Sequence, residues 1–247
     1  MNPRYFYRAP GLKPVALICL SLALCQCPHQ TRPAAALVPH PYFPLEPGGA
    51  WAFAVTRWDY PSRLDAAPLA FTMEKIFRMV SLEPQDRAWR IRTEPPLTEL
   101  FFPEGMNSEP AAWVQDDEGI WMVWKAEKKK ENLRILVLPV RPDPGRSWSA
   151  TTPEGVALEF RLSAGDQSPA AQAPAETGNP AALGLADTIG LEIELSAPGQ
   201  TFHRSVQLAR DLGPVWLEDY SDSGSGPRLL DRWRRTDLSP FTPPHLP

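Results

Sequence analysis

Residues Ala50–Tyr60 read AWAFAVTRWDY, and residues Leu69–Leu82 read LAFTMEKIFRMVSL. In both stretches large apolar side chains recur at every second position, as they do from Trp51 to Val55. A period of two is typical of a β-strand with one apolar face. A helix over the second stretch is the alternative, but prolines bracket it at positions 68 and 84, and proline is excluded from helix interiors. Both stretches therefore predict β-strands, and they set the fold class.

Further strand-like stretches follow along the chain. They are Ala88–Thr93, Trp113–Gln115, Gly119–Lys125, Asn132–Val140, Ser147–Ala150, Gly155–Leu162, Ile189–Leu195, Thr201–Leu208, Pro214–Tyr220 and Arg228–Arg235. Nearly every connection is too short for a crossover helix, so neighbouring strands should be antiparallel. We predict an all-β domain of about a dozen short strands that form a curved sheet, an open barrel or a sandwich. Periodicity does not decide between these shapes.

The folded domain is predicted over residues 42–236, with a proline-rich tail over residues 237–247. A segment at 164–187, rich in Ala, Pro, Gln and Gly, interrupts the strand pattern. This composition favours a flexible surface loop, and a lid over a functional site is the alternative. The turn Asp116–Gly119 predicts a hairpin in which Gly119 supplies a positive φ.

The N-terminus has the three parts of a secretory signal over residues 1–25. Arg4, Arg8 and Lys13 precede an apolar run, PVALICLSLALC, that ends at Cys25. That run is too short to span a bilayer, which takes about 20 apolar residues. A Pro- and Ala-rich tether over residues 26–41 joins the signal to the folded domain. We therefore expect export, to a bacterial cell envelope or beyond it.

The sequence Leu22-Ala23-Leu24-Cys25 resembles the lipobox of bacterial lipoproteins. In that group the cysteine is acylated and becomes the first mature residue, so Cys25 is the expected lipid attachment site. Leu24 departs from the small residue that usually precedes this cysteine, and Cys27 is the second choice. An ordinary cleavage near Ala34–Ala36, which would release a periplasmic or secreted form, is the alternative.

Composition excludes several classes of chemistry from the folded domain. The three cysteines of the chain lie at positions 19, 25 and 27, so the domain has no disulfide, cysteine nucleophile or cysteine-based zinc site. Loss of residues 1–25 would change the net charge from −4 to −7. The remaining Lys and Arg residues are interspersed with acids, so we expect no nucleic-acid partner.

Two segments of the chain resemble each other. Pro47-Gly48 stands four residues before Trp51, and Pro144-Gly145 stands four residues before Trp148, counted from the proline. In each segment the glycine permits a tight turn and the tryptophan enters a strand as a large anchor. If the similarity is more than chance in a proline-rich chain, the domain consists of two similarly built halves.

Tyr42-Phe43-Pro44-Leu45, followed by Pro47-Gly48-Gly49-Ala50-Trp51, is similar to the start of a group of uncharacterised exported bacterial β-rich proteins, often lipoproteins. Two later segments, Leu138-Pro139 with Gly145–Trp148 and Ala209–Val215, match other recurrent parts of that group. The resemblance implies a β-rich envelope protein. It implies no activity and assigns no catalytic residue.

Candidate chemistry is sparse. His203 lies in the predicted strand Thr201–Leu208 and is most simply a solvent-facing residue, although a catalytic histidine is the alternative. Glu192 and Glu194 share one strand face, as paired catalytic carboxylates would. The alternative is that they lie on the solvent-facing side of a half-buried strand. No nucleotide-binding, serine hydrolase or metalloprotease motif occurs. We expect no metal and no cofactor.

Tryptophan is the enriched residue type, with nine in the chain. Trp121 and Trp124 lie three positions apart and should face opposite sides of one strand, so one of them is a possible ligand-contacting aromatic. The sequence favours a lipid-anchored, non-catalytic binding or scaffold module of unknown ligand, whose expected partners are the membrane, through the anchor, and an unknown envelope protein or apolar ligand. A carrier that holds a lipid or other apolar ligand within the curved sheet is the alternative, and an enzyme is the third possibility.

Overall fold

A computed structural model describes residues 40–61, 67–85, 88–103, 109–125, 132–165, 185, 187–224 and 226–238. The predicted signal, the tether up to residue 39, Cys25, Cys27, the tail after residue 238 and the insertion between residues 166 and 184 lie outside the described residues. The description below concerns the folded domain only.

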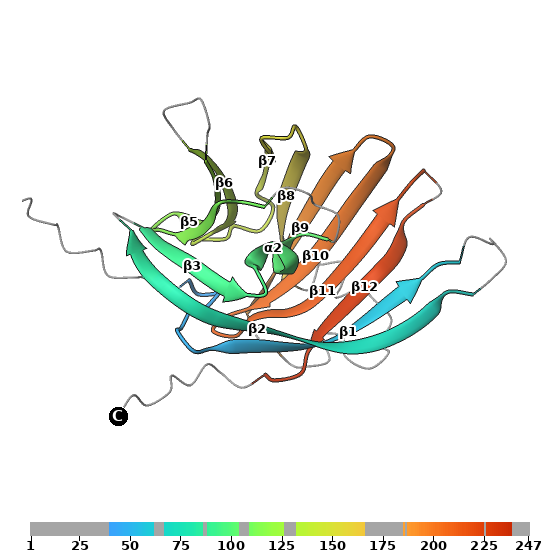
Figure 1. Cartoon of the computed structure of the whole chain (residues 1–247), viewed down its shortest axis with the longest axis horizontal. Helices are drawn as coiled ribbons and strands as arrows, with labels where there is room; N and C mark the ends of the chain where they lie inside the picture. Colours follow the sequence, from blue (N-terminus) through green and yellow to red (C-terminus); the bar gives the residue numbers. More distant parts are fainter. Residues whose placement is uncertain are drawn as a thin grey trace, which may run out of the picture. The chain divides into compact units, whose positions relative to one another are not determined.

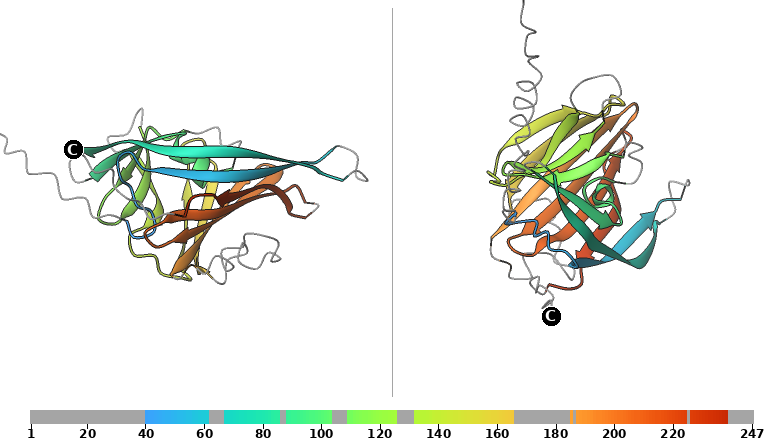
Figure 2. Two further views of the ribbon diagram at one scale, coloured as in Figure 1. Left: turned by 90° about the horizontal axis from the view of Figure 1, so that it is seen from below. Right: turned by 60° about the vertical axis from the view of Figure 1, so that its left-hand side comes forward.

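Twelve strands pair in one antiparallel sheet, which confirms the all-β prediction. They are β1 (Ala50–Asp59), β2 (Leu69–Gln85), β3 (Ala88–Glu94), β4 (Ala112–Gln115), β5 (Gly119–Trp124), β6 (Leu133–Pro139), β7 (Ser147–Thr151), β8 (Ala157–Ala164), β9 (Thr188–Ala197), β10 (Gln200–Ala209), β11 (Gly213–Asp222) and β12 (Arg228–Arg235). The sheet curls into a nearly closed barrel (Figures 1 and 2). The sequence left barrel and sandwich open, and the structure shows the barrel.

The order of strands around the barrel follows their order in the chain. The sheet runs from β6 down to β1, continues from β1 to β12, and then runs down to β7. Among the described strands, β1 and β12 are the one pair of sheet neighbours that are not consecutive in sequence. The break in the sheet falls between β6 and β7, in the middle of the chain.

The two similar segments open the two halves of the sheet in the same local geometry. Gly48 and Gly145 have φ of 84° and 94°. Gly48 N–H donates to the Met79 carbonyl, as Gly145 N–H donates to the Leu162 carbonyl. Trp51 then pairs with Phe77 in the sheet, and Trp148 pairs with Phe160. The first hairpin of each half, β1–β2 and β7–β8, is therefore built to one plan.

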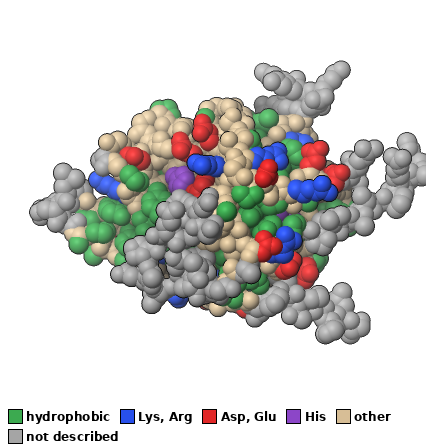
Figure 3. Space-filling model, turned by 180° about the vertical axis from the view of Figure 1, so that it is seen from behind, with side chains coloured by type: hydrophobic (Ala, Val, Ile, Leu, Met, Phe, Trp, Pro, Cys, Tyr) green, Lys and Arg blue, Asp and Glu red, His purple; other side chains and the backbone are tan. Residues whose placement is uncertain are grey.

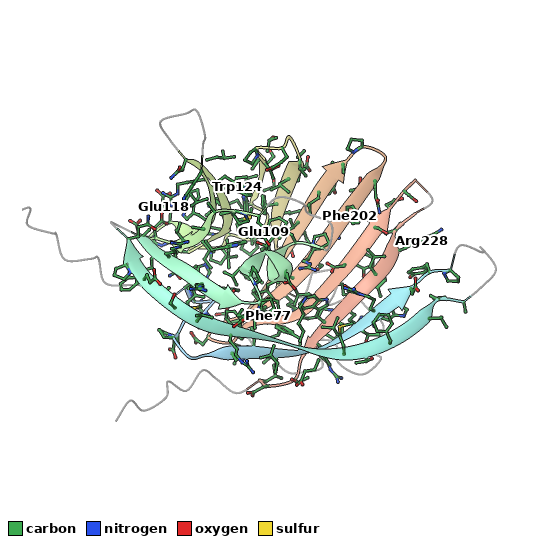
Figure 4. All side chains as sticks on the ribbon, in the orientation of Figure 1. Phe77, Glu109, Glu118, Trp124, Phe202 and Arg228 are labelled. Carbon is green, nitrogen blue, oxygen red and sulfur yellow. The ribbon has the colours of Figure 1, made fainter. Side chains whose placement is uncertain are left out.

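A short helix, α2 (Leu97–Phe101), was not predicted from the sequence, and it packs inside the barrel (Figure 1). Its buried side chains, Leu97, Leu100 and Phe101, join one contiguous cluster of buried residues from all parts of the sheet. Figure 4 shows Phe77 and Trp124 on the inner side of the strands that carry them. Since the inward residues and the helix form one packed cluster, the described interior is filled by side chains.

The edges of β6 and β7 meet without strand pairing, and side chains close this seam. Trp148 on β7 donates its Nε1–H to the carbonyl of Leu136 on β6, with 2.8 Å between the two heavy atoms. The indole stacks on Phe160, with ring centroids 5.2 Å apart. Arg146 lies over the same indole, 5.6 Å from its centroid. At the seam a tryptophan side chain therefore links the two strands by a hydrogen bond, whereas elsewhere in the sheet backbone hydrogen bonds link neighbouring strands.

His40 holds the start of the folded domain against the end of β6. The backbone N–H of Tyr42 donates to Nδ1 of His40 at 3.2 Å, so Nε2 carries the proton and donates to the Pro139 carbonyl at 2.9 Å. The side chain is buried, and burial lowers the pKa of His40 to about 4 despite the hydrogen bond to Pro139. His40 is therefore neutral at neutral pH.

The prediction for Gly119 was wrong in its reason. Gly119 is the first residue of β5 and is not among the glycines with positive φ. A Cβ atom at this position would lie 2.3 Å from the backbone oxygen of Leu138 on β6. The residue is glycine because β6 approaches closely, not because the turn needs a left-handed residue.

Candidate functional site

The outer face of β8–β12 carries polar side chains in two rows that cross the strands. Alternation directs Leu191, Ile193 and Leu195 of β9 inward and leaves Glu192 and Glu194 on the outer face. The pairing register then sets which outward residues stand beside them on the neighbouring strands. Figure 3, seen from behind, shows acidic and basic side chains beside a histidine on this face.

The first row contains two carboxylates that stand directly opposite each other. Glu159 on β8 pairs with Glu194 on β9, Glu194 pairs with His203 on β10, and His203 pairs with Tyr220 on β11. The His203 and Tyr220 rings lie 6.1 Å apart. Like charges directly opposite on adjacent strands destabilise a sheet. The Glu159–Glu194 pair is therefore not explained by folding stability.

The carboxylates of the second row accept hydrogen bonds from their neighbours. Ser205 donates to Oε1 of Glu192 at 2.8 Å, and Glu218 accepts from Tyr220 at 2.9 Å and from Nε of Arg232 at 2.7 Å. Glu218 is fully buried, and such a carboxylate needs the paired cation and hydrogen bonds that it has here. This row is therefore a structural network that lies beside the first row on the same face of the sheet.

Two hollows flank the first row and share Glu194 and His203 as lining residues. One, of about 940 Å³, lies over β7–β10 and is also lined by Glu159, Glu192 and Arg161. The other, of about 770 Å³, lies over the ends of β9–β11 and is also lined by Tyr220 and Asp222. Four carboxylates and one arginine line the two hollows together. The groove that they form is acidic.

His203 was predicted to face solvent, and it does lie on the outer face, but its side chain is only 30% exposed. Its Nε2 lies 2.9 Å from Oε2 of Glu192. Burial opposes protonation of His203, but the carboxylates of Glu192 and Glu194 outweigh it, so the pKa of His203 lies above 6.5. The imidazolium form is thus stabilised by the acidic groove.

The two tryptophans singled out from the sequence lie on opposite sides of β5. Trp124 is buried in the core. Trp121 lies on the outer side, donates its Nε1–H to Asp116 at 2.8 Å and stacks under Arg134, 4.5 Å from the ring centroid. The structure does not bring either tryptophan to the acidic groove. The opposed carboxylates depend on strand register, and that is why sequence analysis did not find this pair.

The described residues contain no group of three or more His, Cys, Asp or Glu side chains that could hold a metal ion. Within the same residues no helix is long and apolar enough to cross a membrane. Comparison of the chain with family models, with curated proteins and with solved structures finds no match.

Proposed function

We propose that this protein is an exported, lipid-anchored and non-catalytic binding module of the bacterial cell envelope, and that its acidic groove binds a positively charged ligand. The charge and length of residues 1–25 support export. The lipobox-like sequence ending in Cys25 supports an N-terminal lipid anchor, and the resemblance to exported bacterial β-rich proteins agrees with both.

The observation that carries the binding proposal is the Glu159–Glu194 pair. Two carboxylates held opposite each other repel, and a ligand cation placed between them removes that repulsion. Glu159 is exposed and Glu194 is half-buried, so a ligand can reach both from solvent. Because the two hollows meet at Glu194 and His203 and together carry four carboxylates, the fitting ligand is extended and carries several positive charges, as a Lys-rich peptide does.

The arrangement around His203 supports a non-catalytic module. In a hydrolase triad the base lies between the nucleophile and the orienting carboxylate. Here the carboxylate of Glu192 lies in the middle, because Ser205 donates to one of its oxygens and His203 contacts the other. The hydroxyl proton is directed at the carboxylate and away from the imidazole, so this order does not activate Ser205.

The alternative, a carrier of an apolar ligand inside the sheet, has less support. Such a carrier requires an apolar cavity of several hundred Å³. The inward side chains, among them Phe53, Phe101 and Trp233, instead belong to one packed cluster that includes helix α2. The hollows at His203 lie on the outer face.

Binding is tested with a hexalysine peptide by calorimetry at low salt, using Glu159→Gln and Glu194→Gln, and Glu74→Gln as a matched control on the outer face of β2. We expect each groove substitution to weaken binding about two- to fivefold, the range for partly exposed ion pairs. We expect the control to bind like the wild type. Binding should also tighten as the pH rises through the pKa of His203, because the groove then loses a positive charge. Equal affinities for all variants would refute the groove as the binding site.

The anchor is tested separately by mass spectrometry of the mature N-terminus. A diacylated or triacylated Cys25 is the expected result. An unmodified start near Leu37 would refute the lipid anchor and leave a soluble exported form.

A further inference from the structure

About half of strand β2 has one edge that no described strand covers. β2 pairs with β1 from Leu69 to Arg78, but its other neighbour, β3, pairs with it only from Arg78 to Gln85. Among the described strands, none pairs with the second edge between Leu69 and Phe77. Over the same stretch the opposite edge of β2 is covered by β1, which pairs in turn with β12 from Phe53 to Arg57, so β2 is the outer strand here (Figure 1).

The free edge is also apolar. Leu69, Phe71 and Met73 are 71%, 46% and 39% exposed and are among the few exposed large hydrophobic residues of the described chain. All residues from Leu69 to Glu74 are exposed. Figure 3 shows hydrophobic side chains gathered at the left, the end of the molecule that the hairpin forms. An exposed apolar strand edge is a template for adding another strand.

We propose that this edge pairs with the same edge of a second copy of the chain, as an antiparallel two-fold dimer centred on Thr72. An interface with a two-fold axis requires a self-complementary surface. In this register Phe71 stands opposite Met73 of the other copy, and Met73 stands opposite its Phe71. The four side chains form one apolar cluster with favourable sulfur–aromatic contacts.

Charge also fits this register. Glu74 stands opposite Ala70 of the other copy, so no two like charges are opposed. Centring the pair on Glu74 would oppose two carboxylates, and centring it on Phe71 would end the ladder at Met73 instead of Lys75. Thr72 meets Thr72 on the outer face, a favourable cross-strand pair.

In this dimer each sheet continues away from the paired edges through β1 and β12, and the β3 strands of the two copies lie at opposite ends of the paired segment. Each sheet broadens from Arg78 onward, where β3 begins to pair, and the exposed edge lies before that point. A paired segment of this length buries less surface than the roughly 1,600 Å² of a standard stable interface. The dimer is therefore reversible and forms at high local concentration.

Site-directed disulfide formation tests the register in the full chain with Cys19, Cys25 and Cys27 replaced by serine. Thr72→Cys should cross-link on mild oxidation, because directly opposed residues place their Cα atoms about 5 Å apart. Thr56→Cys is the matched control, since Thr56 pairs with Thr72 one strand further in and the distance between its copies exceeds disulfide reach. Equal cross-linking of the two variants would overturn the proposal.

Sedimentation equilibrium tests the dimer without cross-linking. The wild-type chain should dimerise with rising concentration, and Phe71→Lys should stay monomeric, because a lysine at an edge opposes pairing. Leu133→Lys, at an exposed leucine on β6 (37% exposed), should dimerise like the wild type. A monomeric wild type at millimolar concentration, or equal dimerisation of both lysine variants, would overturn the proposal.

Discussion

Replacement of His40 by glutamine should remove part of the acid sensitivity of the fold. In the folded chain burial lowers the pKa of His40 to about 4, whereas an unfolded histidine titrates near pH 6.5. The folded state thus binds this proton less tightly than the unfolded state. The stabilisation is present above pH 6.5 and is lost as the pH falls from 6.5 toward 4.

The magnitude follows from these two pKa values. At pH 5 an unfolded His40 is almost wholly protonated, and a folded His40 is largely neutral. The fold therefore loses about 2 kcal/mol between pH 7.5 and pH 5 through this one group. A glutamine side chain does not titrate and can keep a donor near the Pro139 carbonyl, so the His40→Gln variant should lack this loss.

Urea denaturation at pH 7.5 and pH 5 measures the effect as a difference between the two proteins. The comparison is needed because His203 works in the opposite direction. Its pKa is raised, so its contribution is present below pH 6.5 and is lost as the pH rises through its folded pKa. If wild type and His40→Gln lose equal stability between the two pH values, His40 is not a buried neutral histidine and the reasoning is refuted.

Three further substitutions test the barrel, all by urea denaturation. Trp148→Phe keeps the stacking ring but removes the donor to the Leu136 carbonyl, and it should lower stability by about 1 kcal/mol; an unchanged stability would show that the seam needs no hydrogen bond. Gly119→Ala places a Cβ against a backbone oxygen of β6 and should cost about 1–3 kcal/mol, so a neutral result would contradict the close approach. Arg204→Met leaves the buried carboxylate of Asp219 without its bidentate partner and should cost about 3–5 kcal/mol; a loss below about 1 kcal/mol would place Asp219 in contact with water.

The strands could be predicted because alternation is a local property. Strand β2 was predicted over Leu69–Leu82 from its period of two, and in the structure it begins at the same residue and ends at Gln85. Helix α2 could not be found, because five residues, Leu97–Phe101, are too few to display a helical period. The joining of the two halves into one sheet could not be found either, since it depends on the pairing of β1 with β12 at the far end of the chain.

The candidate site could be predicted by face but not by partner. Alternation placed Glu192, Glu194 and His203 on one side of their strands, as observed. It did not place Glu159 opposite Glu194, because the register between β8 and β9 is set across an insertion of unrelated composition. Nor could it show that Ser205 and His203 share the carboxylate of Glu192, since that depends on side-chain rotamers.

The pairing of the last strand with the first makes the barrel sensitive to whether the chain is complete. As a chain emerges N-terminus first, β1–β6 can pair as successive hairpins, but β1 keeps an open edge until β12 arrives. A product that stops before Arg228 would expose the edges of both β1 and β11, and such edges are where aggregation and proteolysis begin. A chain that includes β12 therefore covers both strand edges, whereas a chain truncated before β12 exposes them.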